Sequence, residues 1–389
     1  MDKIALPVFI LLATIGHCGL VVWAYNSINA TGLRRTTIKR IEKLILLIGV
    51  LLPTCAIAAE LYSREAGSAF TFENLRFLNK IFLVVLCLFA VVATPFWIES
   101  RPIFSQSKDL SQHLVSHLWK PKEKGSCFRG RKFSAMGRLP FNEIGWMEVN
   151  QKKLLLDNFP KALHGLTIAH ISDVHLTGQM EPLFYRQAFE WLQQLQPDMF
   201  VLSGDIVDYD RCVDDINVVF DGLHAPLGKY FVLGNHDRRL RDPIQVSNRL
   251  IQLGWHDAGK CHASFLHNGM KVRVVGNELP WFHRYETESH SDDVFSWTLG
   301  IAHSPDQLAW GVKTGCGLLL CGHTHGGQIR FPGIGPIVAP SWHGTRYASG
   351  VFERNGTLMH VSRGMSGVHP YRWGCPPEVS FLHLTDRTN

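Results

Sequence analysis

The stretch Cys321-Gly322-His323-Thr324-His325-Gly326-Gly327-Gln328 decides the fold of the C-terminal part of this chain. It places two imidazoles, those of His323 and His325, one residue apart directly after the apolar run 318–320. On a strand this spacing puts both side chains on one face, and the flanking glycines let both rings turn into one cleft at the strand end. The pattern predicts half of a metal site, because neutral imidazole is a common metal ligand.

Four upstream segments follow the same pattern, in which a short apolar run ends in His, Asp or Asn beside Gly or Ser. Asp173 and His175 follow the run 167–172, and Asp205 follows the run 199–203. Asn235 and His236 follow the run 230–233, and His303 follows the run 299–302. Each run is typical of a buried strand. Because side chains at the carboxyl ends of neighbouring strands converge on one crevice, the five segments together predict a single metal site.

The five segments resemble the metal-binding blocks of the calcineurin-like metallophosphoesterases. The matching residues are Asp173-x-His175, Gly204-Asp205-Ile206-Val207-Asp208, Gly234-Asn235-His236-Asp237, His303 and Gly322-His323-Thr324-His325. Longer forms in residues 322–328, 332–335, 346–350, 361–364 and 375–378 resemble the membrane-associated bacterial branch. That branch includes phosphodiesterases and UDP-2,3-diacylglucosamine pyrophosphatases of the lipid A pathway. The resemblance covers about residues 145–385 and leaves the N-terminal third unexplained.

The resemblance implies two divalent cations drawn from Mn, Fe, Zn or Mg, with Mn favoured. The first cation would be held by Asp173, His175 and His325, the second by Asn235, His303 and His323, and Asp205 would bridge the two. Such a pair, about 3.5–4 Å apart, lowers the pKa of a bridging water and neutralises the phosphoryl group. The expected nucleophile is therefore a metal-bridging hydroxide and not a side chain.

The resemblance also implies a catalytic role for His236, which follows the expected ligand Asn235 and would face the phosphate or the leaving oxygen. Asp208 occupies the partner position in the motif, with Asp237 as its rival, and an acidic neighbour would hold the imidazole charged. The alternatives are a structural imidazole for His236 and a turn or capping role for Asp208.

Substrate contacts are expected from Arg238, Arg346 and Tyr347, with Arg239 and Arg363 as further candidates. Arginine is favoured at such positions because its planar fork matches phosphate oxygens. Surface or core-edge roles remain the alternatives for each of these side chains.

The composition predicts a membrane segment before the catalytic part. Of 389 residues, 46% are hydrophobic, which is high for a wholly soluble enzyme. Residues 4–25, 44–61 and 81–98 are each about as long as a bilayer-spanning helix, and none has a charge in its middle. We therefore expect three transmembrane helices within residues 1–98; three buried core helices are the alternative.

The charge distribution predicts the orientation of these spans and the class of molecule that the chain binds. Lys and Arg outnumber Asp and Glu 18 to 10 up to Asn150 and are outnumbered 21 to 23 after it. The basic excess belongs to the membrane part, so the expected partners are the lipid bilayer and a lipid-linked phosphate substrate, not nucleic acid. Basic residues in 34–43 and in 101–138, compared with three in 64–80, predict a cytoplasmic catalytic domain on the inner membrane. Export through the pair Arg34-Arg35 is the alternative.

Residues 99–145 are expected to form a basic juxtamembrane linker. Within it, Leu110, Leu114, Leu118 and Trp119 recur at near-helical spacing, which favours an amphipathic helix on the leaflet. A solvated linker whose few apolar residues pack on the enzyme is the alternative.

Residues 146–389 are expected to be the metallophosphoesterase domain. Its strands are predicted at 147–156, 167–172, 199–203, 271–276, 297–302 and 317–320, its helices at 183–195, 213–223 and 244–253, and a loop at 280–293. The alternation fits an α/β protein, and the resemblance implies the four-layer α/β/β/α sandwich.

The function expected from these observations is hydrolysis of a phosphodiester or pyrophosphate, with a lipid-linked substrate. A UDP-2,3-diacylglucosamine pyrophosphatase is one specific form, and a non-catalytic metal-binding membrane scaffold is the alternative of another class. Trp281, Phe282, Phe331 and Trp342 are candidates to receive acyl chains, with core packing as the alternative. The substrate, the metal and the oligomeric state do not follow from the sequence.

Overall fold

The computed structural model describes residues 2–62, 72, 75–101, 110–121, 127–283 and 294–387. They fall into two compact units, Met1–Ser105 and Gln106–Asn389, and each is described by itself. Most of the loop expected at 280–293, and the linker residues Lys108, Lys122 and Lys124, lie outside the described residues.

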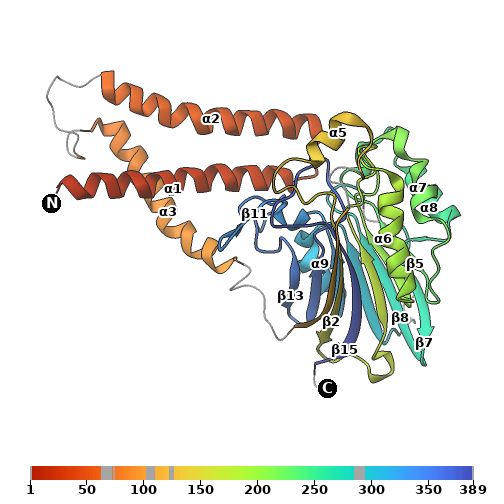
Figure 1. Cartoon of the computed structure of the whole chain (residues 1–389). Coiled ribbons are helices and arrows are strands. Elements are labelled where there is room, and N and C mark those ends of the chain that lie inside the picture. The colour runs from red at the N-terminus through yellow and green to blue at the C-terminus, as the bar shows by residue number, and fades with distance from the viewer. Residues whose placement is uncertain are drawn as a thin grey trace. The chain divides into compact units, whose positions relative to one another are not determined.

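The N-terminal unit consists of three long helices, α1 (Asp2–Asn29), α2 (Arg35–Tyr62) and α3 (Phe77–Glu99) (Figure 1). Their apolar stretches are 24, 28 and 23 residues long, and a membrane span needs about 20. Large apolar side chains such as Leu46, Val91 and Phe96 are exposed. The helices expected from the sequence are therefore present and are long and apolar enough to cross a membrane.

Helices α1 and α3 pack closely because a glycine lies between them. A Cβ at Gly16 would lie 2.0 Å from the Leu86 carbonyl oxygen. Small residues permit such backbone approach between apolar helices. The His17 ring contacts α2, with its Nε2 2.7 Å from the Gly49 carbonyl oxygen.

The C-terminal unit contains a seven-stranded sheet in the order β1-β2-β15-β3-β4-β5-β6. Its strands are β1 (Ser111–Trp119), β2 (Met147–Leu156), β3 (Thr167–Ile171), β4 (Met199–Ser203), β5 (Lys229–Val232), β6 (His256–Asp257) and β15 (Glu378–Asp386). β3, β4, β5 and β6 are parallel to one another, so their carboxyl ends meet at one edge.

A six-stranded sheet has the order β13-β14-β10-β9-β8-β7. Its strands are β7 (Ala263–His267), β8 (Met270–Asn277), β9 (Trp297–Ala302), β10 (Leu318–Cys321), β13 (Gly350–Arg354) and β14 (Thr357–Val361). β8, β9, β10 and β14 are parallel. A small hairpin of β11 (Arg330–Phe331) and β12 (Gly335–Pro336) follows β10.

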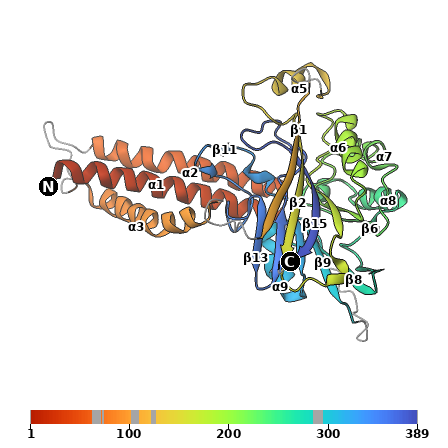
Figure 2. The ribbon, with the colours of Figure 1, turned by 60° about the horizontal axis from the view of Figure 1, so that its bottom comes forward.

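The two sheets pack face to face between helices, because β4 is buried on both faces and its side chains alternate between two cores. Phe200 and Leu202 pack in the core that contains residues of the helices α6 (Pro182–Gln194), α7 (Asp215–Phe220) and α8 (Ile244–Gln252). Met199 and Val201 point the other way and pack against Leu299 and Leu320 of the second sheet. Helix α9 (Leu308–Thr314) covers the far face of that sheet (Figure 2). This is the four-layer α/β/β/α sandwich.

The amphipathic helix expected around Leu110–Trp119 is wrong, because residues 111–119 form strand β1. β1 pairs antiparallel with β2, so the sheet extends into the segment assigned to the linker. Leu114 and Leu118 are four residues apart, a spacing that shares one face in a strand as well as in a helix. Helix α5 (Gly130–Gly137) follows it.

Candidate metal centre

The candidate ligands lie directly beyond the carboxyl ends of β3, β4, β5, β9 and β10. Five of the seven have left-handed backbone: φ is 51° at Asp173, 50° at His175, 54° at Asp205, 72° at His323 and 51° at His325. Residues other than glycine rarely adopt this conformation, and each instance costs about 1–3 kcal/mol. The surrounding structure thus holds these side chains in a strained arrangement, as is typical of functional sites.

Two glycines make room for this arrangement. A Cβ at Gly322 would lie 1.6 Å from Ser172 Oγ and 2.3 Å from Asp173 Oδ2. Gly204 has φ 86°, and a Cβ there would lie 2.6 Å from His303 Nδ1. Only glycine fits at both positions, because any side chain would displace a candidate ligand.

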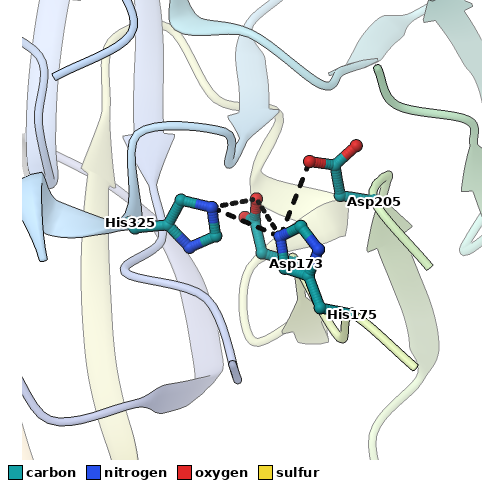
Figure 3. A group of neighbouring side chains, drawn as sticks. All are labelled: Asp173, His175, Asp205 and His325. Carbon is teal, nitrogen blue, oxygen red and sulfur yellow. Dashed lines mark hydrogen bonds and ion pairs between the residues drawn. The ribbon is translucent and has the colours of Figure 1, made fainter. Parts of the chain in front are cut away.

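The first ligand cluster consists of Asp173, His175, Asp205 and His325 (Figure 3). Its ligand atoms all lie within 4.8 Å of one another. His175 Nε2 is 3.6 Å from Asp205 Oδ2, and His325 Nε2 is 3.6 Å from Asp173 Oδ1. All but His325 are fully buried, and the His325 side chain is 15% exposed. This cluster is open to solvent beside His325.

The second ligand cluster consists of Asp205, His303 and His323, again with ligand atoms within 4.8 Å. His303 Nε2 is 3.3 Å from Asp205 Oδ2 and 3.1 Å from the Asn235 side-chain oxygen. Asp205 therefore belongs to both clusters. The structure brings all seven candidate ligands together, in the two groups that the resemblance implies.

The hydrogen bonds of three rings fix their tautomers. The Nδ1–H groups of His175, His303 and His325 face Asp208 Oδ2 at 2.8 Å, the Ser203 carbonyl at 2.7 Å and the Ser366 carbonyl at 3.1 Å. Each Nε2 then carries a lone pair, and those of His175 and His325 are only 3.3 Å apart. Two lone pairs repel at this distance unless a proton or a cation lies between them, so the donor set fits a metal.

The charges of the cluster support the same conclusion. Burial disfavours a charged ring, but Asp205 outweighs it and raises the pKa of His303 to about 9. Burial likewise opposes charge on His175, whereas Asp208 raises its pKa to about 8. In the absence of a cation, His175 and His303 therefore take a second proton at Nε2, in place of the lone pair that each would offer to a metal, and metal binding must displace that proton.

Asp208 joins His175 to the second catalytic candidate, His236. One carboxylate oxygen accepts from His175 Nδ1 and the other from His236 Nδ1. Burial raises the pKa of Asp208, but the two imidazoles outweigh it and hold that pKa well below its usual range. Burial lowers the pKa of His236 to about 4 despite Asp205 and Asp208. Since Nδ1 of the neutral His236 ring faces Asp208, its Nε2 points away from that carboxylate.

Asp237 does not share this position. Its carboxylate accepts from the backbone N–H groups of Ile206, Val207 and Gly234 at 3.0, 2.9 and 2.8 Å. Burial raises its pKa to about 7. Asp237 thus holds the β4 and β5 loops together, while Asp208 contacts the His236 ring.

The candidate substrate residues are distributed differently. Arg238 is exposed two residues after His236, and the Arg239 guanidinium lies 2.8 Å from His236 Nδ1. Tyr347 is buried against Phe352, with ring centroids 4.9 Å apart, and the exposed Arg346 lies over its ring at 5.6 Å. Tyr347 also stands edge to face with the His343 ring, with centroids 5.1 Å apart, and none of these partners is a candidate metal ligand. Their substrate role stays a prediction.

Arg363 is committed elsewhere. Its backbone N–H and its Nε donate to Glu378 at 2.8 and 2.9 Å, and its terminal nitrogen pairs with Glu148. A guanidinium so engaged has no free fork for phosphate, so Arg363 serves the packing of β15 against β2.

Two further side chains lie beside the site: Trp281, which is named above as a candidate acyl contact, and Arg372, which is not assigned from the sequence. Trp281 packs on the His303 and His323 rings, with centroids 5.3 and 4.8 Å away, where an acyl contact was the expectation. Arg372 is fully buried, donates to the Ser366 carbonyl at 2.5 Å and lies 3.2 Å from His325 Nδ1. No local pattern indicates the position of Arg372, because its contacts with the site are long-range.

Comparison with known proteins gives a family match. Residues 166–327 match the calcineurin-like phosphoesterase family. The chain is 26% identical over 257 residues to the uncharacterized metallophosphoesterase YkuE of Bacillus subtilis, covering 64% of this chain and 89% of that protein. It is 27% identical over 264 residues to the phosphodiesterase YaeI of Escherichia coli, covering 64% and 93%.

A third relative is the UDP-2,3-diacylglucosamine pyrophosphatase LpxG of Chlamydia trachomatis. It is 23% identical over 283 residues, and the alignment covers 58% of this chain and 86% of that protein. Together with the family match, these relatives confirm the resemblance drawn from the five sequence blocks.

Proposed function

Since residues 166–327 are a calcineurin-like phosphoesterase domain and the chain is a metal-dependent phosphoesterase, we propose that it cleaves a phosphodiester or pyrophosphate bond of a lipid-linked substrate. The observation that carries this proposal is the pair of ligand clusters that share Asp205, with the His236 ring beside them. Two ligand clusters that share one carboxylate would hold two cations, and both cations could contact the oxygens of one substrate phosphate.

The proposed metal ligands are Asp173, His175, Asp205 and His325 for one divalent cation and Asp205, Asn235, His303 and His323 for the other. Imidazole with carboxylate and amide oxygen suits first-row divalent metals, and Mn²⁺ is our preferred assignment. Two bound cations would supply charge neutralisation at phosphate and activation of water.

His236 is the proposed catalytic residue and Asp208 its partner. The Asp208 carboxylate fixes the ring by taking its Nδ1–H, which leaves Nε2 facing the ligand clusters 3.9 Å from Asp205 Oδ2. A phosphate anion beside Nε2 raises the pKa of this ring, because an opposite charge favours the protonated form. His236 would then donate to the phosphate or to the leaving oxygen.

The membrane part of the proposal rests on α1, α2 and α3. We propose that they span the inner membrane, which holds the site near the lipid surface and raises the effective concentration of a lipid-borne substrate. Basic residues at the start of α2, such as Arg35, Lys39 and Arg40, and those after α3 favour a cytoplasmic catalytic unit.

Within this class, cleavage of a UDP-2,3-diacylglucosamine-like pyrophosphate is the second candidate, favoured by the relative that carries that name. The test is the full chain in detergent with Mn²⁺, assayed against nucleotide-linked lipid pyrophosphates, phospholipid diesters and their water-soluble head groups. We expect kcat/KM to be at least about 10-fold higher for one lipid-linked substrate than for its head group. Equal values for every pair would contradict the lipid-linked substrate.

A further inference from the structure

Six large apolar side chains are exposed on the loops that border the first ligand cluster. Between 38% and 70% of each is exposed. We call this surface the apolar rim, and it consists of Leu139, Phe141, Ile329, Phe331, Ile334 and Val338. Exposed apolar side chains are ordinary when scattered, but a contiguous group marks an interaction site.

The apolar rim is contiguous although its residues come from two distant segments. The Trp373 ring lies between them, with its centroid 5.3 Å from Phe331 and 6.3 Å from Phe141. Ile329 forms a β-bridge with Trp373, and the Ile334 N–H donates to the Phe331 carbonyl at 3.2 Å. The Tyr371 hydroxyl donates to the Pro140 carbonyl at 3.1 Å.

One of the two segments of the apolar rim follows directly from a residue of the first ligand cluster, His325. His325 and Gln328 lie four residues and one residue before Ile329, and the Gln328 side chain donates to the His369 and Tyr371 carbonyls at 2.6 and 2.9 Å. Residues 336–338 pack on Gly327, where an added Cβ would lie 2.2 Å from Pro336. The apolar rim is therefore built onto the edge of the candidate active site.

Basic side chains adjoin the apolar rim. Arg138 is exposed directly before Leu139, and Arg131 and Lys132 are exposed on α5. Glu143, the acidic residue of this segment, is turned inward, where it accepts from the Cys375 N–H at 2.8 Å. Apolar and aromatic side chains beside exposed Lys and Arg match the boundary of an anionic leaflet, where rings enter and cations remain at the headgroups.

A covalent link of limited length ties the catalytic unit to α3. Residues 100–110 join α3 to β1, a link of at most about 40 Å at about 3.5 Å per residue. A bilayer is therefore always near the catalytic unit once α3 is inserted.

From these observations we propose that the catalytic unit docks onto an anionic membrane surface through the apolar rim and the basic residues Arg131, Lys132 and Arg138. Docking would set the mouth of the ligand clusters at the headgroup level. This inference rests on the proposed function in one respect, the insertion of α1, α2 and α3.

The test is lipid photolabelling of the full chain in vesicles that contain phosphatidylglycerol, phosphatidylcholine and a diazirine-bearing phospholipid, followed by peptide mass spectrometry. We expect label in the three helices and also in residues 138–142 and 329–338. Label confined to the helices would overturn the docking proposal and leave the membrane anchoring intact. Absence of label from the helices would instead refute the anchoring.

Variants sharpen this test. Phe141→Ser with Ile334→Ser should lower the labelling of residues 329–338, while Leu266→Ser, 69% exposed on β7, should leave it unchanged. Lys132→Gln should lower it about fivefold in anionic vesicles. Equal labelling of the wild-type chain in pure phosphatidylcholine vesicles would contradict the basic contribution. Loss of label from these segments when the protein density in the vesicles is raised would assign the surface to a second copy of the chain and would overturn the proposal.

Discussion

His175 and His236 stand edge to face with ring centroids 4.5 Å apart, because a single carboxylate, that of Asp208, accepts a hydrogen bond from each. The Nε2 of His175 lies in the first ligand cluster, and that of His236 lies 3.9 Å from Asp205 Oδ2. A single side chain thus couples metal binding to the proposed proton transfer.

The variant Asp208→Asn tests whether this carboxylate supports both metal binding and turnover. The two rings bond to different oxygens of Asp208, and asparagine keeps only one of them, so one ring meets an N–H₂ group and must change tautomer or move. We expect metal affinity at the first cluster to fall about 10–100-fold and turnover to fall at least as much. Metal titration and initial rates measure both effects. Asp214→Asn, whose side chain is 85% exposed, is the control, and wild-type affinity in Asp208→Asn would contradict the shared-carboxylate role.

Asp205→Ala and His236→Ala should fail in different ways. The first removes the carboxylate common to both clusters, so we expect loss of both metals and of turnover. The second leaves the seven ligands intact, so we expect normal metal content and a rate lowered about 10²–10⁴-fold. Elemental analysis beside initial rates tests the pair. Two metals retained in Asp205→Ala would refute the bridging assignment.

The convergence of the candidate ligands was predictable because each motif is local and its strand is apolar, whereas the contacts that surround these residues were not. His170 is an example. Its Nε2 lies 2.9 Å from Ser203 Oγ and its Nδ1 2.9 Å from His360 Nδ1 in the second sheet. A partner 190 residues away leaves no trace in local spacing.

The pairing of the edge strand β1 and the burial of Arg372 were not predicted from the sequence for a similar reason. β1 is almost entirely exposed, so its residues lack the alternation that marks a half-buried strand, and only its pairing with β2 defines it. Arg372 is buried without any apolar pattern around it. The four layers, by contrast, follow from the near-continuous apolar runs of β3, β4, β5, β9 and β10, which are covered on both faces.

Gly322→Ala should destroy the site by steric conflict. The new Cβ would lie 1.6 Å from Ser172 Oγ and 2.3 Å from Asp173 Oδ2, both of which are fully buried. We expect loss of metal binding and a lower Tm. Gly315→Ala is the matched control, because its Cβ meets nothing within 4 Å and costs only the left-handed strain of about 1 kcal/mol. Similar losses in the two variants would show that the contact at Gly322 is not specific.

Glu278 should make stability depend on pH. Burial, reinforced by Asp257 and Asp237, raises its pKa to about 8, although the Leu233 N–H donates to it at 2.6 Å. Because the folded pKa lies above the unfolded value of about 4.3, the folded chain binds the extra proton and stability falls as pH rises from about 4.3 to 8. Glu278→Gln keeps the acceptor for Leu233 and should gain about 2–4 kcal/mol relative to wild type at pH 9.

The measurement for Glu278 is Tm across pH 5–9 in detergent. Wild type should lose stability over this range, and Glu278→Gln should lose less. Glu190→Gln, at an exposed pair with Arg186, should follow the wild-type curve. Parallel curves for wild type and Glu278→Gln would contradict the raised pKa.

The orientation of the catalytic unit is tested by a reporter fused after Asn389. In α2 the basic residues Arg35, Lys39, Arg40 and Lys43 all lie in the first nine residues, and the helix ends at Glu60, Leu61 and Tyr62 without Lys or Arg. The positive-inside rule keeps such an end in the cytoplasm. With the start of α2 in the cytoplasm, α1 begins outside, and after α3 the chain is again in the cytoplasm.

We expect a reporter that requires the cytosol to be active and a periplasm-dependent reporter to be inactive. Moving the excess by Lys39→Glu with Lys43→Glu should weaken the preference, whereas Lys153→Glu, in β2, should not change it. Activity of the periplasm-dependent reporter in the wild-type chain would place the site outside the cytoplasm and would require a substrate on the outer leaflet.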